Sequence, residues 1–170
     1  MSIRDPLSFL PILAGALICL TLSGWAKPGA GAAAVAPEVL SHIRAAPEAV
    51  KFGDSVLRLH ANVWRNFMPL AGAAPDGRPM IASLVVFVEN GPPVALHVDA
   101  IWILQGDLIW QSHDIEAGTT DSRGSANEYV VRDGPRLKPH SYVDIVVSIS
   151  DLKGNNYFLS ARHQSINAVS

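Results

Sequence analysis

Histidine and aspartate are the residues of this sequence whose types and spacing could do chemistry. The chain has six histidines, and His97 and Asp99 lie two residues apart in an alternating segment, so we expect both side chains on one face of a β-strand. His113 ends the neighbouring strand of a predicted hairpin. Imidazole and carboxylate groups from adjacent strands can bind copper or zinc. His97, Asp99 and His113 are therefore candidate metal ligands. The competing interpretation is the polar outer sheet face that the same alternation predicts.

Most other reactive groups are missing from the sequence. Its only cysteine is Cys19, which lies in an apolar N-terminal segment and leaves the rest of the chain without thiols. No serine lies in a Gly-x-Ser-x-Gly motif, and the pair Asp114 and Glu116 is at best a weak calcium site. The sequence predicts no catalytic residue.

A second group of candidates is apolar and suggests contact with a partner. Phe67 and Met68 lie beside a proline in the connection after a strand, and Trp64 lies near the end of that strand. Large apolar side chains in a connection often contact a partner. Alternatively, Phe67 and Met68 close the open end of the fold, and Trp64 packs beneath a neighbouring loop or the N-terminal helix.

The N-terminus has the pattern of an export signal. Residues 6–26 carry no charge and end in small residues, which predicts a signal peptide over residues 1–26 with cleavage after Ala26. The alternative is a retained anchor, since about 20 uncharged residues span a bilayer. Residues 27–51 follow as a flexible tether with a short helix that begins at Pro37. We expect a periplasmic or extracellular location, with membrane attachment only if the signal is uncleaved.

Charge excludes one class of partner. Removal of Arg4 and Asp5 with the signal lowers the 13 Lys and Arg to 12 and the 15 Asp and Glu to 14, so the net charge stays at −2. No basic run is present, so nucleic-acid binding is not expected.

Residues 52–170 have the pattern of β-strands separated by turn-forming residues. The run Leu84–Val88 is continuously apolar, which indicates a strand that is buried on both faces or central in its sheet. Glu116–Asn127 is polar and small throughout, which predicts a mobile surface loop. The predicted strands cover Ser55–Asn66, Met80–Glu89, Val94–Leu104, Leu108–Ser112, Glu128–Arg132, Tyr142–Ser150 and Tyr157 to about Ile166. About seven short strands without a long helix favour an all-β antiparallel sandwich.

One turn decides where two tryptophans point. A two-residue turn at Gly106-Asp107 pairs Trp102 with Gln111 and places the two indoles on opposite faces. A three-residue loop pairs Trp102 with Trp110 instead. Glycine in the first turn position favours the two-residue form.

The segment Leu137-Lys138-Pro139 followed by Tyr142 resembles the tyrosine-corner region of fibronectin type III and related immunoglobulin-like domains. The resemblance covers about ten residues and implies an immunoglobulin-like β-sandwich. It also implies that Tyr142 is mostly buried with its hydroxyl bonded to backbone. Tyr142 comes one residue earlier than in the usual fibronectin spacing, and no functional residue carries over.

These observations predict an exported, non-catalytic binding or accessory domain with a protein or cell-envelope ligand. One alternative is a periplasmic copper- or zinc-binding protein that uses His97, Asp99 and His113. Another, by analogy of fold, is a secreted protease inhibitor with a protruding loop at residues 71–79.

Overall fold

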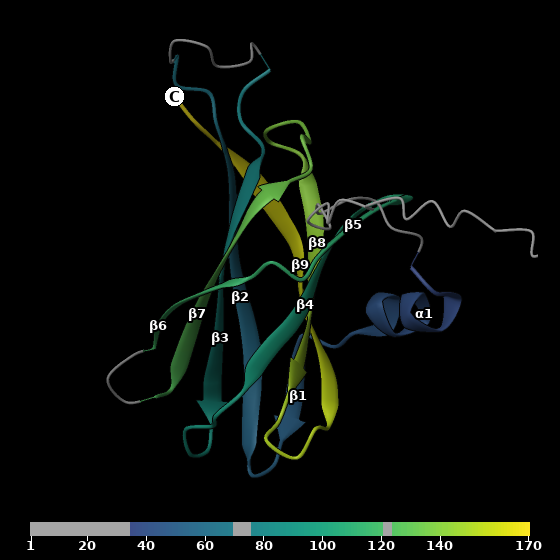
Figure 1. Ribbon diagram of the computed structural model, residues 1–170, viewed down its shortest axis with the longest axis vertical. Helices are drawn as coiled ribbons and strands as arrows, with labels where there is room; N and C mark the ends of the chain where they lie inside the picture. Colours follow the sequence, from purple (N-terminus) through teal and green to yellow (C-terminus); the bar gives the residue numbers. More distant parts are fainter. Residues whose placement is uncertain (1–34, 70–75, 121–123) are drawn as a thin grey trace, which may run out of the picture.

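The chain folds into one curled β-sheet with a short helix on its outside (Figure 1). The computed structural model describes residues 35–69, 76–120 and 124–170. Most of these residues lie in strands, which confirms the all-β prediction. The elements are α1 (Pro37–Ala45), β1 (Ala49–Phe52), β2 (Ser55–Asn66), β3 (Met80–Asn90), β4 (His97–Gln105), β5 (Leu108–Ser112), β6 (Glu116–Thr120), β7 (Ala126–Gly134), β8 (Tyr142–Ser150) and β9 (Asn156–Val169).

The predicted signal peptide, residues 1–26, and residues 27–34 of the predicted tether lie outside the described residues. Among the described residues, no helix has the length and apolar character needed to cross a membrane.

The strands follow the order β5-β4-β8-β9-β2-β3-β7-β6, and β1 pairs with the beginning of β2. Among the described strands, every pair is antiparallel except β2 with β9, which run parallel over their last four residues. The sheet curls so that β2, β3 and β7 lie across the core from β4, β8 and β9 (Figure 1). One face of each of these strands is therefore buried.

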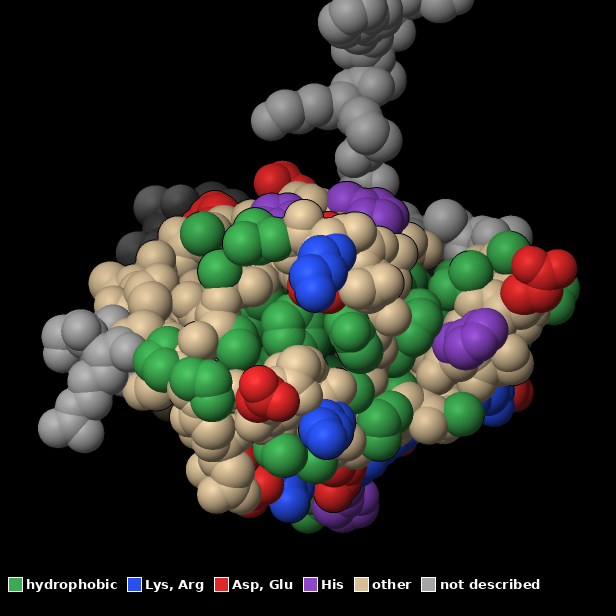
Figure 2. Space-filling model, turned by 90° about the horizontal axis from the view of Figure 1, so that it is seen from below, with side chains coloured by type: hydrophobic (Ala, Val, Ile, Leu, Met, Phe, Trp, Pro, Cys, Tyr) green, Lys and Arg blue, Asp and Glu red, His purple; other side chains and the backbone are tan. Residues whose placement is uncertain are grey.

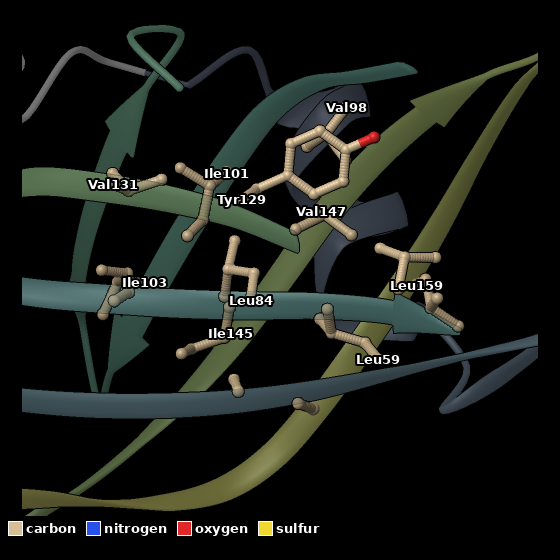
Figure 3. Packing of buried hydrophobic residues seen from close by; sticks show 14 of the residues in the cluster. Leu59, Leu84, Val98, Ile101, Ile103, Tyr129, Val131, Ile145, Val147 and Leu159 are labelled. Atoms are coloured by element: carbon tan, nitrogen blue, oxygen red, sulfur yellow. The ribbon is translucent and has the colours of Figure 1, made fainter. Parts of the chain in front are cut away.

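The main core forms where these inner faces meet. Leu59 and Leu84 come from one half of the sheet, and Ile101, Ile145 and Leu159 come from the other half (Figure 3). In β2, the buried residues alternate with more exposed ones along the whole strand, as the sequence predicts.

Strand β3 shows which interpretation of the continuous apolar run is correct. β3 lies between β2 and β7, so it is central in its sheet. Leu84 and Val86 are buried in the core, whereas Val85 and Phe87 are only half-buried on the outer face. Of the two predicted alternatives, the central position in the sheet is confirmed, whereas the outer face of the strand is only half-buried.

The β4–β5 hairpin has the predicted two-residue turn. Trp102 pairs with Gln111, and Gly106 has a φ of 58°, a left-handed conformation that glycine adopts without strain. Trp110 packs into the main core, whereas Trp102 packs on the outside of the sheet. The prediction that the two indoles point to opposite faces is confirmed.

Helix α1 covers this outer surface. Its Ile43 is fully buried against Trp102 and Val146, and Pro37 lies in its first turn as predicted. The C-terminal end of α1 is bound to β9, where the Ser160 hydroxyl donates to the Ala46 carbonyl over 2.9 Å. Apolar contacts and this hydrogen bond together hold α1 on the sheet.

Two strands depart from the sequence prediction. β6 occupies part of the segment predicted as a mobile loop, and β1 begins three residues before the predicted start of the β-domain. All five residues of β6 are exposed and the strand pairs only with β7. An edge strand with both faces in solvent has no apolar alternation, so its sequence resembles that of a loop.

Candidate functional site

Tyr142 is not the buried corner residue that the resemblance implies. Its side chain is 52% exposed, and no group in the described part of the chain accepts a hydrogen bond from its hydroxyl. The next residues Val143 and Ile145 point into the core, so Tyr142 takes an outward position in the alternation. Its early position in the sequence explains this, because a shift of one residue moves a side chain to the other face of a strand. The prediction of a buried Tyr142 is wrong.

Arg65 makes the contacts that hold this region together. It is only 4% exposed, and its guanidinium donates to the carbonyls of Leu137 over 2.8 Å and of Arg78 over 3.0 Å, and to the carbonyl of Asp76. These bonds connect the end of β2 to the β2–β3 and β7–β8 connections. The carbonyl in the Leu137-Lys138-Pro139 turn thus accepts from a buried arginine.

Sequence reasoning missed Arg65, although a signal was present. Leu57, Leu59, Ala61 and Val63 alternate as inward residues, and position 65 continues the same series. An arginine at an inward position is buried only when its donors are satisfied, so it indicates backbone acceptors nearby.

We call the part of the molecule around Arg65 the upper end. It consists of the described residues of the β2–β3 connection (67–69 and 76–79), the β4–β5 and β7–β8 connections and the last residues of β9. Strand registers place these segments at the same end of the sheet, because Gln105 pairs with Leu108, Tyr142 with Ser165, Asn66 with Val169 and Met80 with Gly134. The C-terminus lies there, at the top of Figure 1.

The three partner-binding candidates differ in their surroundings. Phe67 lies under the Arg65 guanidinium, 5.0 Å from its ring centroid, and its ring touches Gly77 so closely that a Cβ there would come within 2.7 Å of it. Phe67 is half-buried and is covered by the Arg65 guanidinium and Gly77. Met68 is 44% exposed, and Trp64 is half-buried on the outer face of β2 opposite Ile81. Residues 71–75 of the predicted inhibitor loop, 71–79, lie outside the described residues.

Exposed apolar side chains gather at the upper end. Five large apolar side chains of the described residues are exposed: Met68, Leu108, Tyr142, Val169 and Leu152. The first four belong to the upper end. Leu152 lies in the β8–β9 turn at the opposite, lower end and is 90% exposed.

The lower end is formed by the β1–β2, β3–β4 and β8–β9 turns, and Figure 2 views the molecule from this side. Apolar side chains are visible between polar and charged ones in the middle of this view. Val88, Val94, Leu96 and Tyr157 are partly buried here and pack against the main core. These four side chains therefore belong to the rim of the core, in contrast to the exposed Leu152.

The metal-ligand candidates also lie at the lower end. His97 is exposed, and a β-bulge between Val98 and Ala100 leaves Asp99 as the extra residue of β4. His113 Nδ1 lies 3.0 Å from the Asp99 carbonyl oxygen, and His113 Nε2 lies 2.7 Å from Gln111 Nε2. Both ring nitrogens of His113 are thus engaged within the protein. No group of three or more His, Cys, Asp or Glu side chains that could hold a metal ion occurs among residues 35–69, 76–120 and 124–170.

Asp99 has an electrostatic effect on Tyr129. The Asp99 carboxylate accepts from the Ser150 hydroxyl at one oxygen, and its other oxygen is buried without a partner in the described chain. The pKa of Tyr129 is raised, first because burial disfavours the phenolate and second because the Asp99 charge repels it.

We expect Asp99→Asn to lower the pKa of Tyr129 while burial keeps it above the ordinary value of about 10. A raised pKa means that the folded state holds the Tyr129 proton more tightly than the unfolded chain. The stability conferred by neutral Tyr129 is therefore present below about pH 10 and is lost as the pH rises through the raised pKa. Phenolate absorbance during alkaline titration measures the shift, and Tyr129→Phe identifies the step. Asp114→Asn is the control, and an equal shift in that variant contradicts a specific effect of Asp99.

No protein-family model matches this sequence, and a comparison with curated proteins finds no match.

Proposed function

We propose that this chain is an exported, non-catalytic binding domain with an immunoglobulin-like β-sandwich fold, and that it contacts its partner through the upper end. The fold part of the proposal is supported by the strand order. β2, β3, β7 and β6 form one row of neighbours, and β5, β4, β8 and β9 form the other. In chain order these rows correspond to the A-B-E-D and C′-C-F-G sheets of immunoglobulin-like domains.

The observation that carries the binding function is the concentration of exposed apolar side chains at the upper end. Met68, Leu108, Tyr142 and Val169 are each at least 40% exposed. Exposed apolar groups that gather in one region mark contact sites more often than isolated ones do. Arg65 supports the interpretation, because its bonds to the two adjacent connections hold the local backbone in one conformation and lower the entropy lost on binding.

The export signal predicted for residues 1–26 supports a role outside the cytoplasm. The partner is then a protein or another component of the cell envelope. The exported chain is expected to begin at Lys27, which its intact mass tests.

Photo-cross-linking tests the proposed surface. We expect a photoreactive phenylalanine analogue at Met68 or Leu108, introduced one at a time into the full chain, to give a discrete cross-linked product in cells that export it. The same analogue at Leu152 is the matched control, because Leu152 is the most exposed of these apolar residues but lies at the lower end. Equal products from all three positions contradict a specific surface. A hydrolytic activity that one point substitution abolishes contradicts the non-catalytic function.

A further inference from the structure

Tyr142 and His163 form an exposed aromatic pair at the upper end. Their ring centroids are 4.0 Å apart and the ring planes differ by 11°, so the two rings are stacked. Because one face of the Tyr142 ring lies on the imidazole, its 52% exposed area belongs mainly to the other face and the hydroxyl edge. A stacked ring loses little further freedom when a ligand covers its free face.

The backbone at His163 is held in an unfavourable conformation. His163 has a φ of 55°, in the left-handed region that glycine adopts more easily than other residues. It lies in a bulge, where Arg162 and His163 both face Asp144 of β8. Such strain persists only where surrounding contacts impose it, and it is frequent at binding sites.

Asp144 and Arg162 impose this conformation. One Asp144 carboxylate oxygen accepts from the His163 backbone N–H over 2.8 Å, and the other accepts from Arg162 Nη1 over 3.1 Å. Arg162 Nη2 donates in turn to the carbonyls of Arg44 and Ala46 at the end of α1. The aromatic pair is therefore connected to the helix through a continuous set of charged hydrogen bonds, and Asp144 acts as a positioning residue.

The surroundings of the pair indicate the chemistry of a ligand. Asp144 and Arg162 form an ion pair, so the guanidinium beside the aromatic pair is already compensated and is not free to bind a phosphate or carboxylate group. Hydroxyl and amide groups border it instead: Ser165 lies opposite Tyr142, and Gln105 donates to the Ser141 hydroxyl and to the Tyr142 carbonyl. A flat aromatic face bordered by neutral polar groups suits a sugar ring, whose C–H face packs on the aromatic ring and whose hydroxyls form hydrogen bonds around it.

We propose that the Tyr142–His163 pair binds neutral sugar rings of an oligosaccharide or polysaccharide. This proposal rests on the proposed binding function, because it assigns a ligand to one part of the upper end. Tyr142 contacts the sugar directly, and His163 supports the Tyr142 ring from behind.

Three neutral oligosaccharides serve as probes: maltohexaose, cellohexaose and chitohexaose. We expect at least one of them to show saturation transfer from the full chain in NMR and to bind with a measurable Kd. Tyr142→Ala is expected to weaken that binding about tenfold, a change that corresponds to about 1.4 kcal/mol. Tyr142→Phe keeps the aromatic face and should change the Kd by less than about threefold. Leu152→Ala at the lower end is the control and leaves the Kd unchanged.

The His163→Gly variant distinguishes an effect on sugar binding from an effect on the stability of the fold. Glycine relieves the left-handed strain, so the midpoint of unfolding stays the same or rises, whereas loss of the supporting ring weakens sugar binding about threefold or more. Parallel losses of stability and affinity contradict the role of His163 as a support for the ligand platform. Absence of binding to all three probes, or an unchanged Kd in Tyr142→Ala, overturns the sugar site. If the sugar site is overturned but the analogue at Met68 still gives its cross-linked product, the proposed binding function stands.

Discussion

Arg65→Ala is expected to lower the free energy of unfolding by about 3 kcal/mol. The substitution removes a buried guanidinium and leaves the carbonyls of Asp76, Arg78 and Leu137 without their donor. Hydrogen bonds from a charged group each contribute about 1.5–3 kcal/mol, and water that enters the vacated space recovers part of the loss. Denaturant unfolding followed by circular dichroism measures the change, with an unchanged m-value.

Arg65→Lys is the conservative comparison. Lysine keeps the positive charge but lacks the planar group that reaches several acceptors at once, so we expect a smaller loss of about 1–2 kcal/mol. Arg136→Ala is the control for an exposed arginine of the same region. Arg136 pairs with Asp76 near solvent and also donates to the Gly77 carbonyl. Exposed ion pairs contribute less than about 1 kcal/mol. An Arg65→Ala variant that is as stable as Arg136→Ala shows that Arg65 does not hold the upper end together.

Leu84→Ala is the second substitution with a large expected effect, a loss of about 2–5 kcal/mol of unfolding free energy. Leu84 is fully buried in the centre of the core, where truncation leaves a cavity that the two halves of the sheet cannot close. Thermal or denaturant unfolding measures the loss.

Val85→Ala is the matched control for Leu84→Ala. It lies next to Leu84 in the same apolar run, but its side chain is half-buried on the outer face of β3. We expect it to cost less than about 1 kcal/mol. Similar losses from the two variants would mean that the outer face of β3 is covered, for instance by a partner or a second copy of the chain.

Features that depend on residues close together in the sequence were predicted well. Glycine and aspartate at 106 and 107 define a two-residue hairpin turn, and that turn alone places Trp102 and Trp110 on opposite sides of the sheet. The alternation in β2 likewise identifies its inward residues. β6 escaped prediction because a doubly exposed edge strand carries no apolar pattern.

The candidate sites were predicted less well. Trp64, Phe67 and Met68 were recognised as apolar residues near a connection, but their sequence does not distinguish packed Phe67 from exposed Met68. The structure separates them because the Arg65 guanidinium and Gly77 cover the Phe67 ring. His163 had no sequence signal, since a bulge depends on the register between two strands.

Tyr142 and Leu137 show which features can be predicted from the sequence and which depend on the tertiary structure. Consecutive residues alone predict that a proline-led turn precedes an alternating strand beginning at Tyr142, because proline geometry and side-chain alternation are local properties. The stacking of Tyr142 on His163 arises from the three-dimensional arrangement of the strands, and so does the hydrogen bond from Arg65 to the carbonyl of Leu137, which lies 72 positions further along the chain. Contacts of this kind depend on how the sheet curls and which strands become neighbours, and no short segment encodes that arrangement.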